Sequence, residues 1–448
     1  MPYTAPTLAQ AQAALASRLN DTSNVHWVAD ELTAYLREAL RTWNAWTSHW
    51  RDRGTLTLTP AQAFYDLTVD LSGSLRAQTI TNGELIADLQ YALMEPAAPF
   101  GTWTGTDQFT LAQLSTAIQR RVDQFLRETG CQQTRAELPF AATASGRMSL
   151  DEAVLIVRRA AWLPGATAPA ADQWRRPLLR DDDWAASAFL PSWRTPSDRV
   201  RAYSLSDTPP LDLQLIPPPA ADGTLDLVSI NKSATIDPVV SAVIAIPDDW
   251  AWVIKWGALA DLLSGDGLAL DPARAAYCEQ RWQQGVDACV RTPIVLNAYN
   301  STATPILTAS LNEADKFSPT WQLVPGVPRR LLLAGQNLVA SWPPPGNSQG
   351  NLTLDVVRNA PVPTVAGDVL QISADVYDSI LDLAQHTALF KQGPGELELA
   401  SGLLERAMRA AGVELSKQQA EEPERAALTR QNAQDGDAVP REQTAVPT

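Results

Sequence analysis

The residue types that most often transfer protons or bind metals are sparse in this chain. Its three histidines, His26, His49 and His386, are scattered and do not have the spacing of metal ligands, so we expect each to be structural or exposed. The sequence also lacks a phosphate-binding GxxxxGK loop followed by Ser or Thr, a GxGxxG turn after a strand and a GxSxG nucleophile turn. We therefore predict no catalytic residue, no cofactor and no metal site.

Two acidic clusters are the best candidates for carboxylate chemistry. The run Asp181–Asp183 could bind a divalent cation through hard oxygen ligands, but it lacks the interleaved spacing of a calcium loop. The alternative is a solvated cap in front of a helix that begins near Trp184. The second cluster is Asp248 with Asp249. Either cluster would suit a glycoside hydrolase only if a second carboxylate faced it at roughly 5–10 Å in a Trp-lined groove.

Composition narrows the class of protein. Among 448 residues, 35 Lys and Arg oppose 50 Asp and Glu, and the net charge of -15 argues against a surface that grips nucleic acid or an anionic membrane. The three cysteines, Cys131, Cys278 and Cys289, form neither a disulfide framework nor a zinc motif, which fits a reducing compartment. The N-terminal residues lack the pattern of a signal peptide, and we infer no membrane span.

The first third of the chain is predicted to be helical. Apolar residues recur at helical spacing in residues 7–19, 28–50, 81–94 and 111–129, and the last helix has Thr110 as its cap and Gly130 as its stop. We expect residues 1–134 to form a compact helical unit that builds an assembly. Residues 28–50 carry a wide aromatic stripe that needs a partner surface, and its predicted interface residues are Leu36, Leu40, Trp43, Trp46 and Trp50.

Mixed structure is predicted from residue 135 onward, which makes the fold class α+β. Residues 135–295 form one module, with a helix at 149–161, strands near 211–216 and 224–230, and a helix pair at 250–263 and 271–289. Asp271 and Pro272 occupy the cap and first position of the last helix. Residues 296–413 form a second module, and residues 414–448 form a polar tail that only a partner surface would order.

The second module repeats a motif of the first. LQLIPPPAADGTLDLV begins at residue 213, and VASWPPPGNSQGNLTLDVV begins at residue 339. Each reads as a β-hairpin with three prolines that must lie at a strand boundary or edge, because proline donates no backbone hydrogen bond. An offset of 126 also places Asp249 on Asp375. We predict an internal duplication of hairpin plus helix pair over residues 198–290 and 325–412; the alternative is coincidental proline-turn composition.

Residues 19–53, LNDTSNVHWVADELTAYLREALRTWNAWTSHWRDR, resemble the N-terminal signature of head-to-tail adaptor (connector or neck) proteins of tailed bacteriophages. In that signature an Asn-Asp turn and a Trp precede an ELxxYLxEAL run. Later segments, RVRAYSL, LDLQLIPPPAADGTLDLV and IPDDWAWVIKWGALADLL through DPARAAYCEQRWQQGV, resemble the strand, hairpin and closing helices of longer phage virion structural proteins. The resemblance covers residues 19–290, whereas the second module departs from the family pattern.

The resemblance implies a non-enzymatic virion protein of the neck between capsid and tail, assembled in the host cytoplasm. About a dozen identical subunits would form a ring under the portal protein, with tail or nozzle proteins on the other face and DNA passing through the lumen without specific binding. No membrane partner is implied. One alternative is another tail, collar or baseplate structural protein. A second is a carbohydrate-binding or hydrolytic tail component that uses exposed Trp for stacking and paired carboxylates for catalysis.

Overall fold

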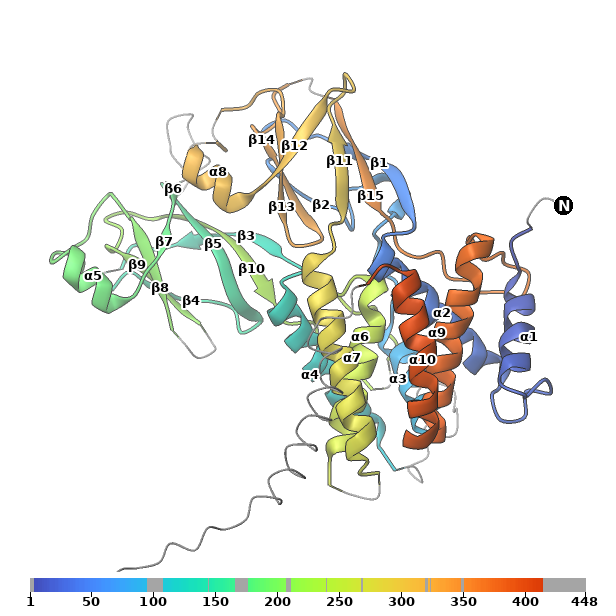
Figure 1. Ribbon diagram of the computed structural model, residues 1–448. Coiled ribbons are helices and arrows are strands. Elements are labelled where there is room, and N and C mark those ends of the chain that lie inside the picture. The colour runs from blue at the N-terminus through green and yellow to red at the C-terminus, as the bar shows by residue number, and fades with distance from the viewer. Residues whose placement is uncertain are drawn as a thin grey trace, which may run out of the picture.

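Figure 1 shows a layer of helices with two β-rich units on one side of it. This computed structural model describes residues 4–94, 108–143, 145–165, 176–206, 211–238, 240–266, 269–318, 321–322, 324–347 and 350–413. The presence of both long helices and antiparallel strands confirms the α+β class. The predicted tail, residues 414–448, lies outside the described residues.

The first β unit, called unit I, contains strands β3 to β10 and the short helix α5. Its strands form two four-stranded sheets, in the orders β3-β10-β5-β6 and β4-β9-β8-β7. Because β6 and β7 are separated by Leu178 alone, one continuous path runs through both sheets. The elements are β3 (Thr134–Phe140), β4 (Arg147–Ser149), β5 (Val154–Pro164), β6 (Arg176–Pro177), β7 (Leu179–Arg180), α5 (Asp183–Phe189), β8 (Ala202–Leu205), β9 (Asp212–Ile216) and β10 (Gly223–Asn231).

The second β unit, called unit II, is assembled from two distant parts of the chain. Its seven strands follow the order β1-β15-β11-β12-β13-β14-β2. This order matches the path β3-β10-β5-β6/β7-β8-β9-β4 through unit I strand for strand when β6 and β7 are counted as one strand. All of unit I lies in the sequence between β2 and β11, so one unit is inserted in the other. The elements are β1 (Arg51–Thr57), β2 (Phe64–Asp66), β11 (Val295–Tyr299), β12 (Pro305–Ser310), α8 (Leu311–Phe317), β13 (Arg330–Ala334), β14 (Leu338–Trp342) and β15 (Asn351–Val357).

The helical layer pairs helices from opposite ends of the chain. One apolar core joins α1 and α2 to α9 and α10, and another joins α3 and α4 to α6 and α7. The predicted helical unit of residues 1–134 is therefore divided between two cores, and it also contributes β1 and β2 to unit II. The helices are α1 (Leu8–Arg18), α2 (Ala29–Thr47), α3 (Asn82–Leu93), α4 (Leu111–Thr129), α6 (Ala251–Ser264), α7 (Pro272–Arg291), α9 (Ala374–Leu389) and α10 (Pro394–Ala410), with short 3-10 turns η1 (Ser72–Ser74), η2 (Asp248–Trp250) and η3 (Phe390–Gln392).

Most of the predicted helices are confirmed, and their caps explain why. Thr110 accepts a hydrogen bond from the backbone N–H of Gln113, and Gly130 ends α4 in the left-handed conformation, as expected. Asp271 caps α7 with Pro272 behind it. The predicted helix at residues 149–161 is wrong, because this segment forms the long strand β5. The run VLIVRRAAWL is rich in β-branched and aromatic residues, and β5 is held between β10 and β6 by hydrogen bonds that the sequence does not reveal.

The two proline triplets occupy the same place in each β unit. Their first peptide bonds, Ile216–Pro217 and Trp342–Pro343, are both cis. In unit I the N–H of Ser197 donates to the carbonyl of Pro218 at 2.8 Å, and in unit II the N–H of Gly326 donates to that of Pro344 at 2.8 Å. The flanking strands do not pair with each other, so the predicted hairpins are wrong. Each triplet is a corner that carries the chain between non-adjacent strands.

The correspondence between the units extends beyond the prolines. In both units a strand is followed by a seven-residue helix and then by a parallel partner strand: β7, α5 and β8 in unit I, and β12, α8 and β13 in unit II. The indole of Trp193 donates to Ser187, and the indole of Trp321 donates to Asp315, six residues back in each case. The repeated order thus begins before the predicted start at residue 198.

Units I and II contact each other through α8. Arg159 of β5 forms a bidentate ion pair with Asp315, with N–O distances of 2.6 and 3.0 Å. Trp321 donates to the same carboxylate at 2.9 Å, and Val228 of β10 packs into an apolar cluster whose other members belong to unit II. A charged pair that is this well hydrogen-bonded fixes geometry as well as adding stability. The two units therefore have a defined relative orientation.

Helices α6 and α7 pack closely because each has a glycine at the crossing. A Cβ atom added to Gly257 would lie 2.4 Å from Cε3 of Trp282, and one added to Gly285 would lie 2.3 Å from Cγ2 of Val253. Such contacts are too short for real atoms, so the helices would have to separate. This crossing lies in the core that joins α3 and α4 to α6 and α7.

We expect Gly257→Ala to lower the free energy of unfolding by about 1–3 kcal/mol, because overpacking at the crossing outweighs the helix preference of alanine. Gly402→Ala on α10 is the matched control, since a Cβ there would meet nothing within 4 Å, and it should raise stability by about 0.5–1 kcal/mol. Urea denaturation measures both. Equal shifts in the two variants would contradict the close packing of α6 on α7.

Buried ion pairs join α2 to later helices. Lys255 of α6 donates to Glu38, whose other oxygen accepts a hydrogen bond from the indole of Trp256 at 3.0 Å. Lys391 donates to both oxygens of Glu31 at 2.8 and 3.0 Å. All four charged side chains are at most 6% exposed. Removing one member would leave a buried unpaired charge, so these pairs fix which helices meet.

Asp88 on α3 lies among the same charges. Burial raises the pKa of Asp88 to about 7, although Lys255 opposes the rise, and the nearby Glu84 and Glu38 add to it. Arg41 donates to Glu84 at 2.8 Å and so is engaged elsewhere. Since the carboxyl of an unfolded Asp titrates near pH 3.9, the folded chain binds more protons between about pH 4 and 7. Stability therefore falls as the pH rises from about 4 to 7, and the loss is complete above the folded pKa.

Asp88→Asn should raise the free energy of unfolding by about 1–3 kcal/mol at pH 8 and change it little at pH 4, because only the ionised carboxylate carries the burial cost. Thermal denaturation at the two pH values measures the difference. The exposed Asp198→Asn is the control for charge removal and should be near neutral at both. A pH-independent effect of Asp88→Asn would be inconsistent with the raised pKa.

Candidate functional site

The predicted aromatic interface lies inside this chain. Leu36 and Leu40 are fully buried, and Trp43 and Trp50 are 4% and 5% exposed. Together they pack against α9 in the core that joins α1 and α2 to α9 and α10, and the indole of Trp50 donates to the carbonyl of Gln371 at 2.9 Å. The stripe does need a partner surface, but its own chain supplies that surface. Its assignment as an intersubunit interface is therefore corrected.

Trp46 is the member of the stripe that remains partly exposed. Its ring makes an edge contact with Trp252, with centroids 6.3 Å apart. Most other described tryptophans are core residues, and five of them, Trp162, Trp250, Trp252, Trp256 and Trp282, are among the largest fully buried side chains. Trp184 on α5 is the exception at 82% exposure.

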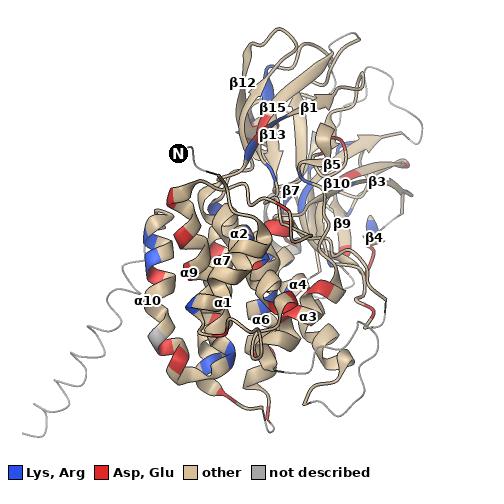
Figure 2. Ribbon diagram, turned by 90° about the vertical axis from the view of Figure 1, so that its right-hand side faces the viewer, with Lys and Arg blue, Asp and Glu red and all other residues tan. Residues whose placement is uncertain are grey.

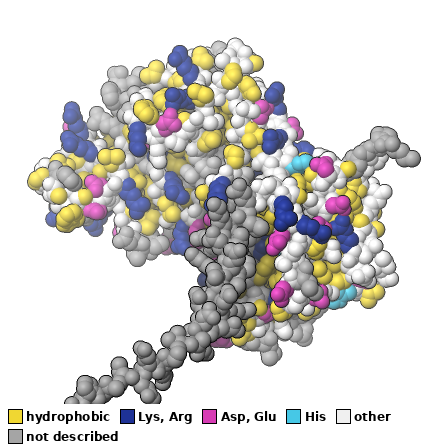
Figure 3. Space-filling model, in the orientation of Figure 1, with side chains coloured by type: hydrophobic (Ala, Val, Ile, Leu, Met, Phe, Trp, Pro, Cys, Tyr) yellow, Lys and Arg dark blue, Asp and Glu magenta, His cyan; other side chains and the backbone are white. Residues whose placement is uncertain are grey.

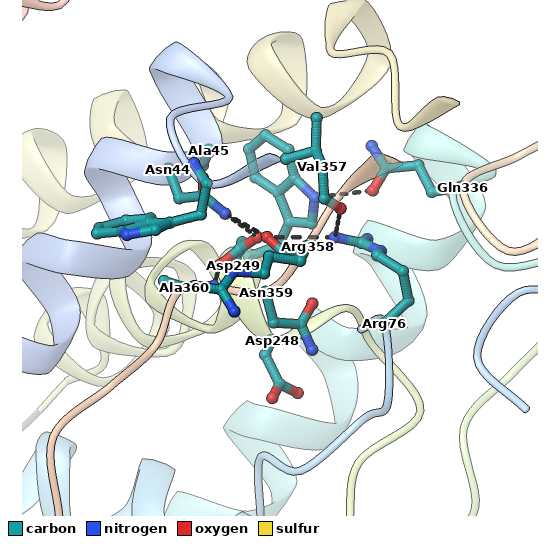
Figure 4. A network of polar contacts seen from close by, with 12 residues as sticks. Asn44, Ala45, Arg76, Asp248, Asp249, Gln336, Val357, Arg358, Asn359 and Ala360 are labelled. Carbon is teal, nitrogen blue, oxygen red and sulfur yellow. Dashed lines mark hydrogen bonds and ion pairs between the residues drawn. The ribbon is translucent and has the colours of Figure 1, made fainter. Parts of the chain in front are cut away.

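The carboxylates of Asp248 and Asp249 accept structural hydrogen bonds. Asp248 accepts from the backbone N–H and the hydroxyl of Thr79 and from the N–H of Ile80, and so fixes the chain entering α3. Figure 4 shows that its carboxylate points away from that of Asp249. The two side chains are 5% and 3% exposed. They do not form the open, facing pair that a hydrolase needs.

Asp249 is the centre of a polar junction between the helical layer and unit II (Figure 4). Its carboxylate accepts from the side-chain amide of Asn44 at 2.7 Å and from the N–H of Ala360 at 3.0 Å, with a guanidinium nitrogen of Arg76 at 3.7 Å. Asn44 also donates to the carbonyl of Arg358 at 2.8 Å. The junction therefore joins α2, the loop after η1, η2 and the segment after β15.

The charges at this junction compensate each other. Burial raises the pKa of Asp249 to about 6, and Arg76, the N–H of Ala360 and the amide of Asn44 each oppose that rise. Burial also lowers the pKa of the Arg76 guanidinium, against the attraction of Asp249 and Asp248. Arg76 further donates to the carbonyl of Val357 at 3.3 Å. At neutral pH the pair is ionised, and each charge depends on the other.

The other sequence candidates also have structural roles. Asp182 caps α5 by accepting from the N–H of Ala185 at 2.6 Å, which confirms the predicted cap of a helix near Trp184. His386 is buried between Tyr277 and the carbonyl of Ala400, and burial lowers its pKa to about 3, so the imidazole is neutral. Within the described ranges, no group of three or more His, Cys, Asp or Glu is arranged to hold a metal ion.

Two of the clefts formed by the described residues open on the helical layer. The smaller one, about 560 Å³, lies between α4 and the end of α6 and contains Asp261 and Asp266 but no Trp. Arg121 binds Asp261 at 2.6 and 3.0 Å. The larger one, about 1050 Å³, contains Trp46 but only one acid, Asp287. Neither cleft combines an indole wall with two free, facing carboxylates.

We call the larger cleft the α7 groove. It lies between the end of α2, the second half of α7 and the end of α10, and it is lined by Ala45, Trp46, Thr47, Ser48, Arg51, Ala276, Tyr277, Gln280, Gln283, Gln284, Asp287, Ala288, Arg291, Thr292, Pro293, Leu296, Met408 and Val413. The sequence did not predict it, because its walls come from three distant segments. Three glutamines, two arginines and Asp287 stand among its apolar lining residues.

Arg281 lies behind one wall of this groove, and the sequence did not predict its role either. Its guanidinium carbon is 5.5, 4.9 and 5.9 Å from the ring centres of Trp46, Trp252 and Trp256. The side chain is 3% exposed, and no described carboxylate lies within ion-pair distance of it. Stacking on indoles stabilises such a cation. The sequence signal was a charge in an otherwise apolar helix stripe between Cys278 and Gly285.

Comparison with known proteins adds no assignment. No protein-family model matches the chain, and no curated protein matches it either. Among the described residues no helix has the length and apolar character needed to cross a bilayer.

Asp249→Asn should lower the free energy of unfolding by about 3–5 kcal/mol, because it leaves the buried Arg76 guanidinium without a counter-charge. Asp375→Asn is the control at the corresponding position of the second half, where the carboxyl is exposed at the start of α9, and it should cost under about 1 kcal/mol. Chemical denaturation of both variants measures the contrast. Equal, small losses would mean that Asp249 does not hold the junction together.

Proposed function

We propose that this chain is a non-enzymatic structural protein of a tailed bacteriophage, a head-to-tail adaptor in the virion neck between capsid and tail. Copies form a homo-oligomeric ring under the portal protein, tail or nozzle proteins dock on its other face, and DNA leaves through the lumen during genome ejection without specific binding. The resemblance of residues 19–290 to that family supports the proposal. A net charge of -15 suits a conduit that must not bind a polyanion.

The observation that carries the proposal is a set of exposed apolar side chains on the two β units. On unit I, Leu179 and Trp184 are 75% and 82% exposed. On unit II, Leu307 and Phe317 are 69% and 78% exposed, on the strand and helix that correspond to β7 and α5. Hydrophobic side chains at the outer end of unit I are visible in Figure 3. Among the described residues, Trp184 and Phe317 are the aromatic members of the exposed large hydrophobic side chains, and aromatic residues are enriched at contact sites.

Two such patches meet the requirement of a ring. A closed ring is a head-to-tail assembly, so each subunit needs two different surfaces that fit each other. The patches on α5 and α8 replace the buried stripe of α2 as the candidate contact surfaces. The well-defined orientation of units I and II, held by Arg159 and Asp315, would keep the two patches at a constant angle.

We further propose that the two units arose by internal duplication, with one copy inserted into the other. The support is the shared strand order, the shared position of the proline corners and the matching indole hydrogen bonds of Trp193 and Trp321. Each unit is followed by a helix pair, α6 with α7 and α9 with α10. The duplicated body would thicken the wall of the ring.

The alternatives are weighed by specific observations. A tail, collar or baseplate structural protein would use the same exposed patches, and the position of its density in the particle, seen by electron cryomicroscopy, distinguishes it from an adaptor. A carbohydrate-binding or hydrolytic component needs facing carboxylates in a Trp-lined groove. Asp248, Asp249 and Asp261 are instead bound by backbone, amide or guanidinium groups, which disfavours that alternative.

The test is the mass of the purified protein with and without portal protein, measured by light scattering or native mass spectrometry. We expect a species of about a dozen times 48.5 kDa, at least when portal is present. Trp184→Asp should abolish that species, because losing a contact-site tryptophan commonly costs 2 kcal/mol or more per interface. Val69→Asp, at another exposed apolar position, should leave it intact. A monomer under both conditions would contradict the proposal.

A further inference from the structure

The α10 helix ends at the α7 groove. Gly412 adopts a left-handed φ of 70°, the N–H of Gly412 donates to the carbonyl of Arg409, and the N–H of Val413 donates to that of Met408. This pair of bonds is a Schellman motif, which reverses the chain sharply at a helix end. Met408 and Val413, the apolar pair of the motif, both line the groove. The last described residue, Val413, therefore lies in the groove wall.

The groove is positively charged although the protein is acidic. Arg51 and Arg291 line it, Arg281 lies behind the indole of Trp46, and Asp287 is the single acidic side chain in the wall. Two lining arginines against one aspartate give the groove wall a net charge of +1, compared with -15 for the whole chain. Arg51 also donates to the carbonyl of Ser48 at 2.9 Å and so offsets the negative end of α2. An anionic ligand is favoured.

The sequence that follows Val413 has the complementary charge. Residues 414–424 read ELSKQQAEEPE, in which Glu414, Glu421, Glu422 and Glu424 oppose Lys417, giving a net charge of -3. Leu415 supplies one apolar anchor two residues after Val413. Extended, eleven residues span roughly 36–40 Å, and α7 with its 20 residues is about 30 Å long, so the segment can follow the helix.

We propose that the α7 groove is a binding site for the acidic segment 414–424 of the same chain. The glutamates lie against Arg51 and Arg291, with the field of the indole-enclosed Arg281 behind them, and Leu415 packs beside Met408 and Val413. Because Val413, the residue before the segment, lines the groove, the effective concentration of the segment there is high, and docking within one chain outcompetes docking between chains. The site stands independently of the proposed ring, since it exists in a single subunit.

Hydrogen exchange of the full-length protein, read by mass spectrometry, tests the site. Amides of residues 414–424 should exchange at least about tenfold more slowly than those of residues 431–448, the internal reference. The protection should fall in 1 M salt, which screens exposed charges, and stay constant over about a hundredfold range of protein concentration. Exchange of the two segments at the same rate would overturn the proposal, and protection that rises with concentration would assign the groove to a second copy instead.

Charge reversal separates a specific groove from general attraction. Arg291→Glu should remove most of the protection of residues 414–424, whereas Arg127→Glu, an equal charge change at an exposed position of α4, should not. Combining Arg291→Glu with Glu421→Lys and Glu422→Lys should restore it. Equal effects of the two single variants, or no rescue, would overturn the assignment. None of these outcomes depends on ring formation, so the site and the proposed function fail or stand separately.

Discussion

The buried carboxylate of Asp249 imposes a condition that several distant segments of this chain must meet together. A charge removed from water has to be paired and hydrogen-bonded, and Asp249 obtains its partners from α2, the loop after η1 and the segment after β15. These partners lie more than a hundred residues away in the sequence in each direction. Helical layer and unit II can therefore form only in one mutual arrangement. The position of unit I is then fixed as well, because the ion pair between Arg159 and Asp315 joins it to unit II.

Charged and aromatic residues of the core act on one another rather than on a substrate. Figure 2 shows Lys, Arg, Asp and Glu distributed over the helices that form the layer. Glu38 with Lys255 and Glu31 with Lys391 join helices that are distant in sequence. The indoles around Arg281 let a cation stay buried without a carboxylate. In such a core the polar residues determine which helices pair. The features left to serve the function are the shape of the molecule and its exposed apolar side chains.

Local structure could be predicted from the sequence where local chemistry decides it. The caps of α4 and α7, the helical spacing of α1 to α4 and the strand-ending role of the prolines all depend on neighbouring residues. The helix predicted at residues 149–161 is wrong because the apolar pattern of VLIVRRAAWL suits both a helix and a strand. Pairing with the neighbouring strand β10 decides in favour of the strand. The stripe on α2 was recognised as a packing face, but its partner α9 lies more than three hundred residues away. Insertion of unit I into unit II is a fact of long-range pairing, which no local pattern encodes.

The two β units and the helical layer form a single cooperative body. Differential scanning calorimetry of the purified protein tests it most directly. The structure predicts one transition whose calorimetric and van't Hoff enthalpies agree, because the Asp249 junction and the Arg159 pair link all three parts. Two resolved transitions, with one unit melting while the other remains folded, would contradict it.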